Sequence, residues 1–216
     1  MNSNLTEIVF VLDRSGSMSG LEQDTIGGFN SMLQKQKAET GDAVVSTVLF
    51  DHECQVIHDR VPIAKVEPLT EKQYFTRGST ALLDALGGAI HHIGNVHKYA
   101  REEDRPEKTI FIITTDGFEN ASRRYTAERV RSMVKHEQEK YGWEFLFLGA
   151  NIDAITVARD YGIAADRAVR YECDERGTEL SFDTITTVLS SVRRREDIAP
   201  GWKASIEKDY KNRGKK

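Results

Sequence analysis

The chain has 216 residues, a length that fits one fairly large domain, and 39% of them are apolar, which excludes a wholly disordered chain. The formal net charge of −4 does not favour nucleic-acid binding. The two cysteines, Cys54 and Cys173, lie in no C-x-x-C pair, so we expect no disulfide framework and two ordinary buried thiols.

The first apolar segment predicts a strand rather than a membrane anchor. Glu7 to Leu12 reads EIVFVL, a nearly continuous apolar run that suits a strand covered on both faces. The run is too short for a signal peptide or a spanning helix, and no basic segment precedes it. We therefore expect no membrane association and a reduced, cytoplasmic compartment.

A helix and a hairpin are expected next. Ile26, Phe29 and Leu33 recur at helical spacing and predict a helix over about residues 21–38. Two β-rich runs follow, Val44 to Phe50 and Cys54 to Val61, and the link between them is very short. A parallel crossover needs about a dozen residues or more, so this link predicts an antiparallel hairpin, which we place at one edge of the sheet.

The rest of the chain alternates between helices and strands. An apolar stripe predicts a helix that starts near Thr80 or Ala81, and a strand ending on Asp116 follows it. Further strands are expected near residues 143–151 and 167–173, and further helices near 126–140, 152–162 and 178–194. This alternation predicts an α/β fold, doubly wound, with a mostly parallel sheet and helices on both faces.

The last segment differs in composition from the rest. From Arg193 onward the chain has nine Lys or Arg and four Asp or Glu, and Pro200 and Gly201 interrupt it. We expect one domain over residues 1–195 and a basic C-terminal tail over residues 196–216 that is not part of the core. A short docked helix from Trp202 to Tyr210 is the alternative for this tail.

Polar residues follow the predicted strands in three places. Asp13, Ser15 and Ser17 alternate after the first strand, Ser79 and Thr80 open a helix, and Asp116 closes a later strand. In an open parallel sheet, ligands bind outside the carboxyl ends of the strands. Carboxylates and hydroxyls without imidazole or thiolate form a hard-oxygen ligand set, which suits Mg²⁺ or Mn²⁺ and is poorly suited to zinc.

These motifs resemble the metal-ion-dependent adhesion site of the von Willebrand factor type A domain. The resemblance covers about Glu7 to Arg193 and is greatest to bacterial stand-alone members. It implies a six-stranded sheet with one antiparallel edge strand. It also implies that Mg²⁺, with Mn²⁺ or Ca²⁺ as alternatives, is bound by Asp13, Ser15, Ser17, Thr80 and Asp116. Ser79 is a rival to Thr80.

The resemblance implies a protein-binding module without chemistry of its own, whose ion binds an Asp or Glu of a partner protein. Arg14, Met18, Phe118 and Glu119 are expected to shape the contact surface around it. One alternative is a metal-dependent phosphohydrolase with Asp13 as nucleophile, although no second acid stands two residues on. The other is a regulatory subunit of an ATPase or of a stress-response complex.

Other polar residues have simpler interpretations. Asp84 is expected to be a first-turn acid at the positive end of its helix rather than a sixth metal ligand. His91, His92 and His97 share a helix but lack the H-E-x-x-H spacing of a zinc site, so we expect them at the surface or its boundary. The sequence leaves the oligomeric state open.

Overall fold

The computed structural model describes residues 2–213 and confirms the predicted α/β fold. Six strands form one sheet in the order β3-β2-β1-β4-β5-β6. They are β1 (Asn2–Asp13), β2 (Asp42–Phe50), β3 (Cys54–Pro62), β4 (Pro106–Thr115), β5 (Glu144–Ala150) and β6 (Ala168–Tyr171). Neighbouring strands are parallel except β2 and β3, so the antiparallel strand lies at one edge, as the short link predicts.

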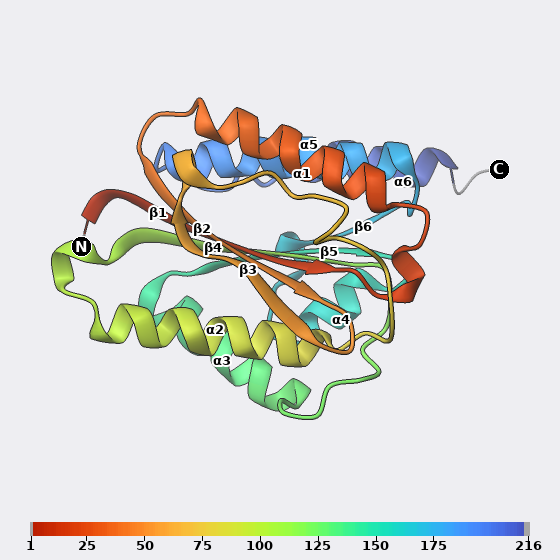
Figure 1. The fold of residues 1–216 in the computed structure, drawn as a ribbon, viewed down its shortest axis with the longest axis horizontal. Helices are drawn as coiled ribbons and strands as arrows, with labels where there is room; N and C mark the ends of the chain where they lie inside the picture. Colours follow the sequence, from red (N-terminus) through yellow and green to blue (C-terminus); the bar gives the residue numbers. More distant parts are fainter. Residues whose placement is uncertain (1, 214–216) are drawn as a thin grey trace.

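Helices cover both faces of the sheet (Figure 1). One layer contains α1 (Glu22–Lys37), α5 (Glu175–Arg193) and α6 (Ala204–Arg213). The other contains α2 (Leu82–Tyr99), α3 (Ala127–Tyr141) and α4 (Ala154–Asp160). Within residues 2–213, no helix has the length and apolar character needed to cross a membrane.

The central strand β1 explains why its sequence is apolar without alternation. Ile8, Phe10 and Leu12 belong to the core beneath α1 and α5, whereas Val9 and Val11 belong to the core on the α2 side. Both faces of the strand are therefore buried, as expected for a parallel sheet between two helical layers.

The order of the strands determines where a ligand site is expected. β1 lies beside β4 in the sheet. The connection after β1 runs to α1 on one face of the sheet, whereas the connection after β4 runs to α3 on the other face. This arrangement makes the carboxyl ends of β1 and β4 the switch point, where open α/β sheets bind their ligands.

The C-terminal segment packs against the body more closely than the sequence indicates. Ile198 and Ile206 are 6% and 2% exposed and belong to the core cluster on the α1 and α5 face, so the expectation that the tail lies outside the core is wrong. The Trp202 indole donates to the Asp166 carbonyl at 2.7 Å, and α6 lies against β6. The division at residue 195 stays a prediction about domain organisation.

Candidate metal centre

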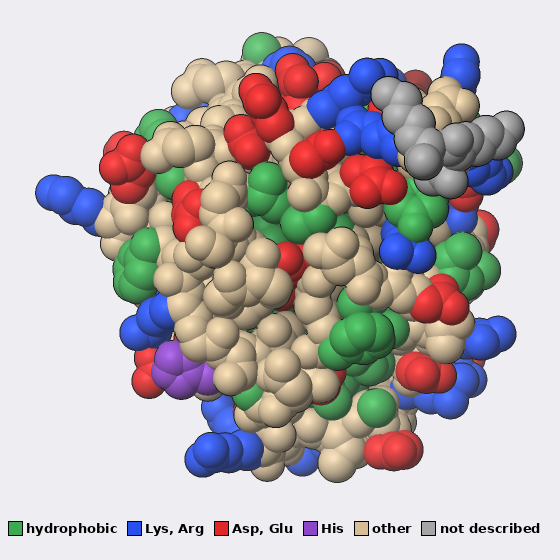
Figure 2. Space-filling model, turned by 90° about the vertical axis from the view of Figure 1, so that its right-hand side faces the viewer, with side chains coloured by type: hydrophobic (Ala, Val, Ile, Leu, Met, Phe, Trp, Pro, Cys, Tyr) green, Lys and Arg blue, Asp and Glu red, His purple; other side chains and the backbone are tan. Residues whose placement is uncertain are grey.

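The carboxyl ends of β1 and β4 bring four of the predicted ligands together. Asp13 is the last residue of β1, and Asp116 directly follows β4. The Ser17 hydroxyl donates to Asp116 Oδ1 at 2.5 Å, and the Ser15 and Ser17 hydroxyls lie 3.1 Å apart. Figure 2 faces this edge, where acidic atoms lie recessed near the middle with hydrophobic side chains beside them.

Thr80 reaches the same place from the loop before α2. A methyl group added to Gly117 would lie 3.3 Å from both the Ser17 and the Thr80 hydroxyl oxygens, so both hydroxyls face this glycine. Thr80 is 3% exposed, whereas its rival Ser79 is an exposed residue. The geometry thus groups Thr80, rather than Ser79, with the other four side chains.

Three residues outside the predicted ligand set, Thr115, Tyr74 and Cys173, hold the two aspartates in place. Asp13 accepts hydrogen bonds from the Ser15 backbone N–H at 2.7 Å and from the Thr115 hydroxyl at 2.6 Å. The Tyr74 hydroxyl donates to the Asp13 carbonyl at 2.5 Å. The Cys173 thiol donates to Asp116 Oδ2 at 3.7 Å. Only Thr115 had a sequence signal, since it stands directly before Asp116.

The environment makes both acids hard to ionise. Burial raises the pKa of Asp13 to about 6, an effect that its hydrogen bonds from Thr115 and Ser15 offset only in part and that the nearby Asp116 charge reinforces. Burial also raises the pKa of Asp116. A cation between the two carboxylates would remove this penalty, because an opposite charge nearby favours the ionised form.

A comparison of all buried acids separates these two from the rest. Five Asp or Glu side chains are buried among the described residues: Glu7, Asp13, Asp51, Asp116 and Asp209. Three of them form an ion pair with a guanidinium: Glu7 with Arg60 at 2.8 Å, Asp51 with Arg14 at 2.9 Å, and Asp209 with Arg213 at 2.9 Å. Within residues 2–213, Asp13 and Asp116 have no such pair. Buried charges need a pair or a metal.

The donor set fits a divalent ion. Two carboxylates and three neutral hydroxyls come from three loops, and the oxygen atoms that face one another are those Mg²⁺ prefers. The two carboxylates would balance the charge of the ion without excess.

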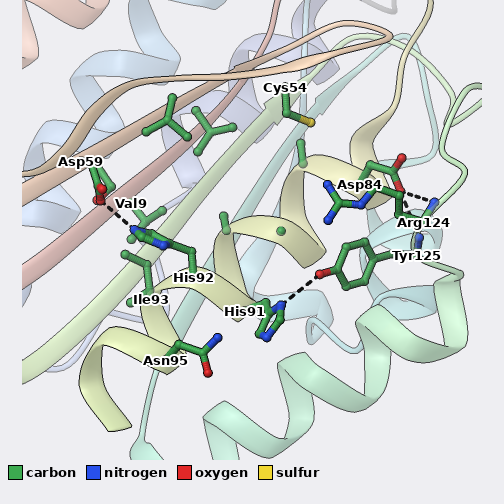
Figure 3. Close-up of a pocket in the computed structure, with 16 residues that line it drawn as sticks. Val9, Cys54, Asp59, Asp84, His91, His92, Ile93, Asn95, Arg124 and Tyr125 are labelled. Atoms are coloured by element: carbon green, nitrogen blue, oxygen red, sulfur yellow. Dashed lines mark hydrogen bonds and ion pairs between the residues drawn. The ribbon is translucent and has the colours of Figure 1, made fainter. Parts of the chain in front are cut away.

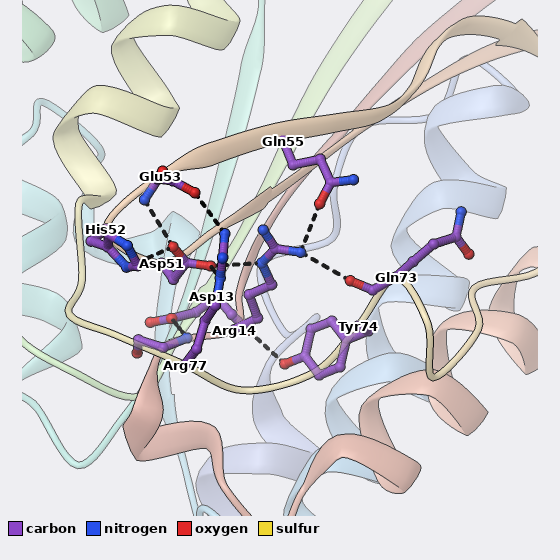
Figure 4. A network of polar contacts seen from close by, with 10 residues as sticks. Asp13, Arg14, Asp51, His52, Glu53, Gln55, Gln73, Tyr74 and Arg77 are labelled. Carbon is purple, nitrogen blue, oxygen red and sulfur yellow. Dashed lines mark hydrogen bonds and ion pairs between the residues drawn. The ribbon is translucent and has the colours of Figure 1, made fainter.

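A second acidic group lies beside the site but does not suit a cation. Asp51, His52 and Glu53 stand within ligand distance of one another. However, Asp51 Oδ2 already accepts from Arg14 and Arg77, each at 2.9 Å, and its Oδ1 accepts from the Glu53 backbone N–H (Figure 4). Two guanidinium charges at this carboxylate would repel a metal ion.

The loop after β4 is tied to the start of α2. The Asn120 side chain accepts from the Thr80 N–H at 2.8 Å, and the Asn120 N–H donates to the Thr80 carbonyl at 3.0 Å. Glu119 accepts from the backbone N–H groups of Leu83 and Ser122. This clamp fixes the Thr80 hydroxyl relative to Asp116.

Asp84 lies in the first turn of α2, as predicted, and its carboxylate has a second role. Its carboxylate accepts backbone hydrogen bonds from Arg123, Arg124 and Tyr125 at 2.8–3.0 Å. It therefore stabilises the loop before α3 in addition to lying in the first turn of α2, and it is not grouped with the metal ligands.

A hollow beside α2 holds no comparable pair of buried, unpaired acids, because the two acids that line it, Asp59 and Asp84, both have partners. A cavity of about 410 Å³ lies between α2 and the β2–β3 hairpin (Figure 3). Four of the polar side chains that line it are paired with each other, since the His92 ring contacts Asp59 at 2.8 Å and the Tyr125 hydroxyl contacts the His91 ring. His91 and His92 are exposed and His97 is half-buried, as predicted.

Three expectations about side chains near the site are corrected. Arg14 and Met18 are 1% and 2% exposed and so cannot form a contact surface, whereas Phe118 is 64% exposed. Glu119 is half-buried and acts in the clamp. Cys54 is exposed and Cys173 is half-buried, so neither is an ordinary buried thiol. Arg14 is buried because its guanidinium turns inward to Asp51.

Comparison with known proteins supports the fold. No protein-family model matches the sequence, and no curated protein matches it. Among solved structures, the von Willebrand factor domain of the type V pilus tip protein Mfa5 from Porphyromonas gingivalis aligns with a TM-score of 0.65 at 11% identity. That alignment covers 92% of this chain and 99% of the Mfa5 domain.

Two longer proteins contain the same fold. A von Willebrand factor type A protein from Catenulispora acidiphila aligns with a TM-score of 0.58 at 14% identity, over 88% of this chain and 43% of that one. Proximal thread matrix protein 1 from the mussel byssus, solved with a zinc-occupied MIDAS motif, aligns with a TM-score of 0.59 at 16% identity, over 87% of this chain and 46% of that one. This chain spans less than half of either. It has the fold of the von Willebrand factor type A domain.

Proposed function

We propose that this chain is a metal-dependent protein-binding module. Asp13, Ser15, Ser17, Thr80 and Asp116 hold a divalent ion at the carboxyl edge of the sheet, and a partner protein supplies an Asp or Glu to that ion. The observation that carries the proposal is that Asp13 and Asp116 are the two described buried acids without a guanidinium partner.

The proposed ion is Mg²⁺, with Mn²⁺ and Ca²⁺ as alternatives. All five side chains offer oxygen, and hard cations prefer oxygen ligands. Cys173 brings a sulfur atom to the site, and its thiol contacts Asp116 as a hydrogen-bond donor. Burial raises the pKa of its thiol to about 12, which keeps it neutral at physiological pH and disfavours a thiolate ligand.

The proposed ligands leave the bound ion able to attract a further carboxylate from a partner. Three of the proposed ligands are neutral hydroxyls, and the only two formal charges come from Asp13 and Asp116. Mg²⁺ commonly keeps water ligands in proteins, and a carboxylate can replace one of them. Ser17 and Gly16 are exposed, so this side of the site is open to a partner.

A binding role is supported better than hydrolysis. An aspartyl nucleophile needs a second acid close by to protonate the leaving group, but the residue two positions after Asp13 is Ser15. Within residues 2–213, no lysine forms a hydrogen bond or an ion pair with the five proposed ligands. We therefore propose that the chain is not an enzyme. A regulatory subunit would use the same site toward its ATPase.

The cytoplasmic location is also a proposal. It rests on the two cysteines, Cys54 and Cys173, which are both free. Cell fractionation with a tagged full-length chain tests it.

The binding proposal is tested by calorimetry with a candidate partner, in Mg²⁺ and in chelator. Each surface Asp and Glu of the partner is then changed to its amide. We expect affinity only with metal and its loss on one amide substitution. Equal affinity in chelator, or no effect of any single carboxylate, contradicts the proposal.

A further inference from the structure

One exposed aromatic side chain differs from the others in its surroundings. Within residues 2–213, four aromatic side chains are largely exposed: Phe75, Tyr99, Phe118 and Tyr141. A cationic side chain covers the ring of three of them: Phe75 with Arg14 and Arg77, Tyr99 with Lys98, and Tyr141 with Lys140. Phe118, at 64% exposure, has no ring or cation contact among the described residues.

Phe118 also lies beside the proposed metal site. It follows Gly117, the residue at which an added methyl would lie 3.3 Å from both the Ser17 and the Thr80 hydroxyl oxygens. Asp116 precedes that glycine. A partner whose carboxylate reaches the site therefore approaches the loop segment that carries Phe118.

The loop that carries Phe118 is held in place on its C-terminal side. Asn120 clamps Thr80 through two hydrogen bonds, and Glu119 accepts from the N–H groups of Leu83, Ala121 and Ser122. A fixed backbone lowers the ordering cost of binding, and a phenylalanine side chain has few rotamers to lose. Exposed aromatics on rigid supports are typical anchors of protein interfaces.

We propose that Phe118 is the apolar half of the partner-binding surface. The preferred partner is a protein segment in which an Asp or Glu stands directly beside an aromatic or large aliphatic residue. The carboxylate goes to the metal site and the apolar side chain covers the Phe118 ring. This inference rests on the proposed function, because it presumes a carboxylate at the metal.

The test uses three end-blocked pentapeptides, titrated into the full-length protein by NMR in Mg²⁺ and in chelator. Their sequences are Gly-Phe-Asp-Phe-Gly, Gly-Gly-Asp-Gly-Gly and Gly-Phe-Asn-Phe-Gly. We expect the first peptide to bind about tenfold more tightly than the second, the ratio for burying most of one apolar side chain. The asparagine peptide should not bind at the metal site.

Two variants separate the contributions. Phe118→Ala should abolish the preference for the first peptide and leave the Mg²⁺-induced rise in melting temperature unchanged, which also shows that the variant is folded. Tyr99→Ala, which removes an aromatic with 78% exposure at the other end of α2, should keep the preference.

The remaining outcomes distinguish a failure of the role proposed for Phe118 from a failure of the proposed function. If both aspartate peptides bind equally with Mg²⁺, or if Phe118→Ala keeps the preference, the role of Phe118 is wrong and the metal-dependent function stands. If neither aspartate peptide shows Mg²⁺-dependent binding, the proposed function fails and this inference fails with it.

Discussion

Two buried carboxylates near the end of β1 have opposite environments. Asp51 accepts from the guanidinium groups of Arg14 and Arg77, each at 2.9 Å. Asp13, next to Arg14 in sequence, meets the Thr115 hydroxyl and the Ser15 N–H instead. The Arg14 donors go to Asp51, Gln55 and the Gln73 carbonyl. The guanidinium of Arg14, the residue next to Asp13, therefore pairs with Asp51 and not with Asp13.

The two environments move the two pKa values in opposite directions. Burial alone would raise the pKa of Asp51, but hydrogen bonds from the Glu53 N–H and Arg77, together with the Arg14 charge, lower it below its ordinary value. Burial raises the pKa of Asp13 to about 6, because its neutral donors compensate less. The contrast is consistent with a structural charge at Asp51, and it supports our proposal that Asp13 binds a cation from outside the chain.

The largest expected effect is a loss of stability when the Asp51 carboxylate is removed. Asp51→Ala leaves the Arg14 guanidinium, 1% exposed, without its partner, and breaking a buried pair in this way costs about 3–5 kcal/mol of unfolding free energy. Urea denaturation in chelator measures this loss. Asp59→Ala is the control, because its pair with His92 is exposed and should contribute less than about 1 kcal/mol. Equal losses in both variants would contradict the role given to Asp51.

At the proposed metal site, removing the acid should raise the unfolding free energy instead of lowering it. Asp13→Asn in chelator at pH 7 removes a buried charge that has no cationic partner, and we expect the unfolding free energy to rise by about 1–2 kcal/mol. The same urea experiment measures it. A loss as large as that of Asp51→Ala would show that the Asp13 charge is already compensated within the chain.

The pH dependence sharpens this contrast. The folded pKa of Asp13, about 6, lies above its ordinary value of 3.8, so its contribution in chelator falls as pH rises between these values and is constant above them. The gain from Asp13→Asn should therefore grow from pH 4 to pH 7. The folded pKa of Asp51 is lowered, so its contribution is present at neutral pH and disappears as pH falls through that pKa. Urea unfolding from pH 3 to 7 measures the difference in unfolding free energy between each variant and the wild type. If this difference changes in the same direction with pH for both variants, the assignment is contradicted.

A smaller effect separates Thr80 from Ser79. Thr80→Val removes the hydroxyl that faces Gly117 and should weaken Mg²⁺ binding about tenfold, roughly the contribution of one oxygen contact. Ser79→Ala should leave the affinity unchanged. Titration calorimetry of the two variants compares them, and the reverse order of effects would make Ser79 the ligand.

The fold could be predicted because it depends on local patterns. The buried runs, the helical spacings and the three-residue link before Cys54 specify a mostly parallel sheet with an antiparallel edge. Boundaries and docking depend on single contacts. α5 begins at Glu175, earlier than expected, because the Asp174 side chain accepts from the Gly177 N–H. Ile206 is buried although the spacing of apolar residues in the tail is irregular.

The site could be predicted only in part, for a related physical reason. Acids and hydroxyls at strand ends are visible in sequence because parallel strands end at the same edge. The direction of the Arg14 side chain, the Asn120 clamp on Thr80 and the Cys173 contact with Asp116 join residues that are distant in sequence. No local pattern encodes such pairs, and they distinguish the unpaired acids from the paired ones.

Titration of Mg²⁺ into the metal-free protein by calorimetry tests the central claim most directly. It compares the wild type with Asp13→Asn, Asp116→Asn and Glu53→Gln, the last of which removes an exposed acid of the neighbouring Asp51 group. We predict one site per chain that is lost in both aspartate variants and kept in Glu53→Gln. No binding to the wild type, or binding lost in Glu53→Gln and kept in Asp13→Asn, would contradict the account.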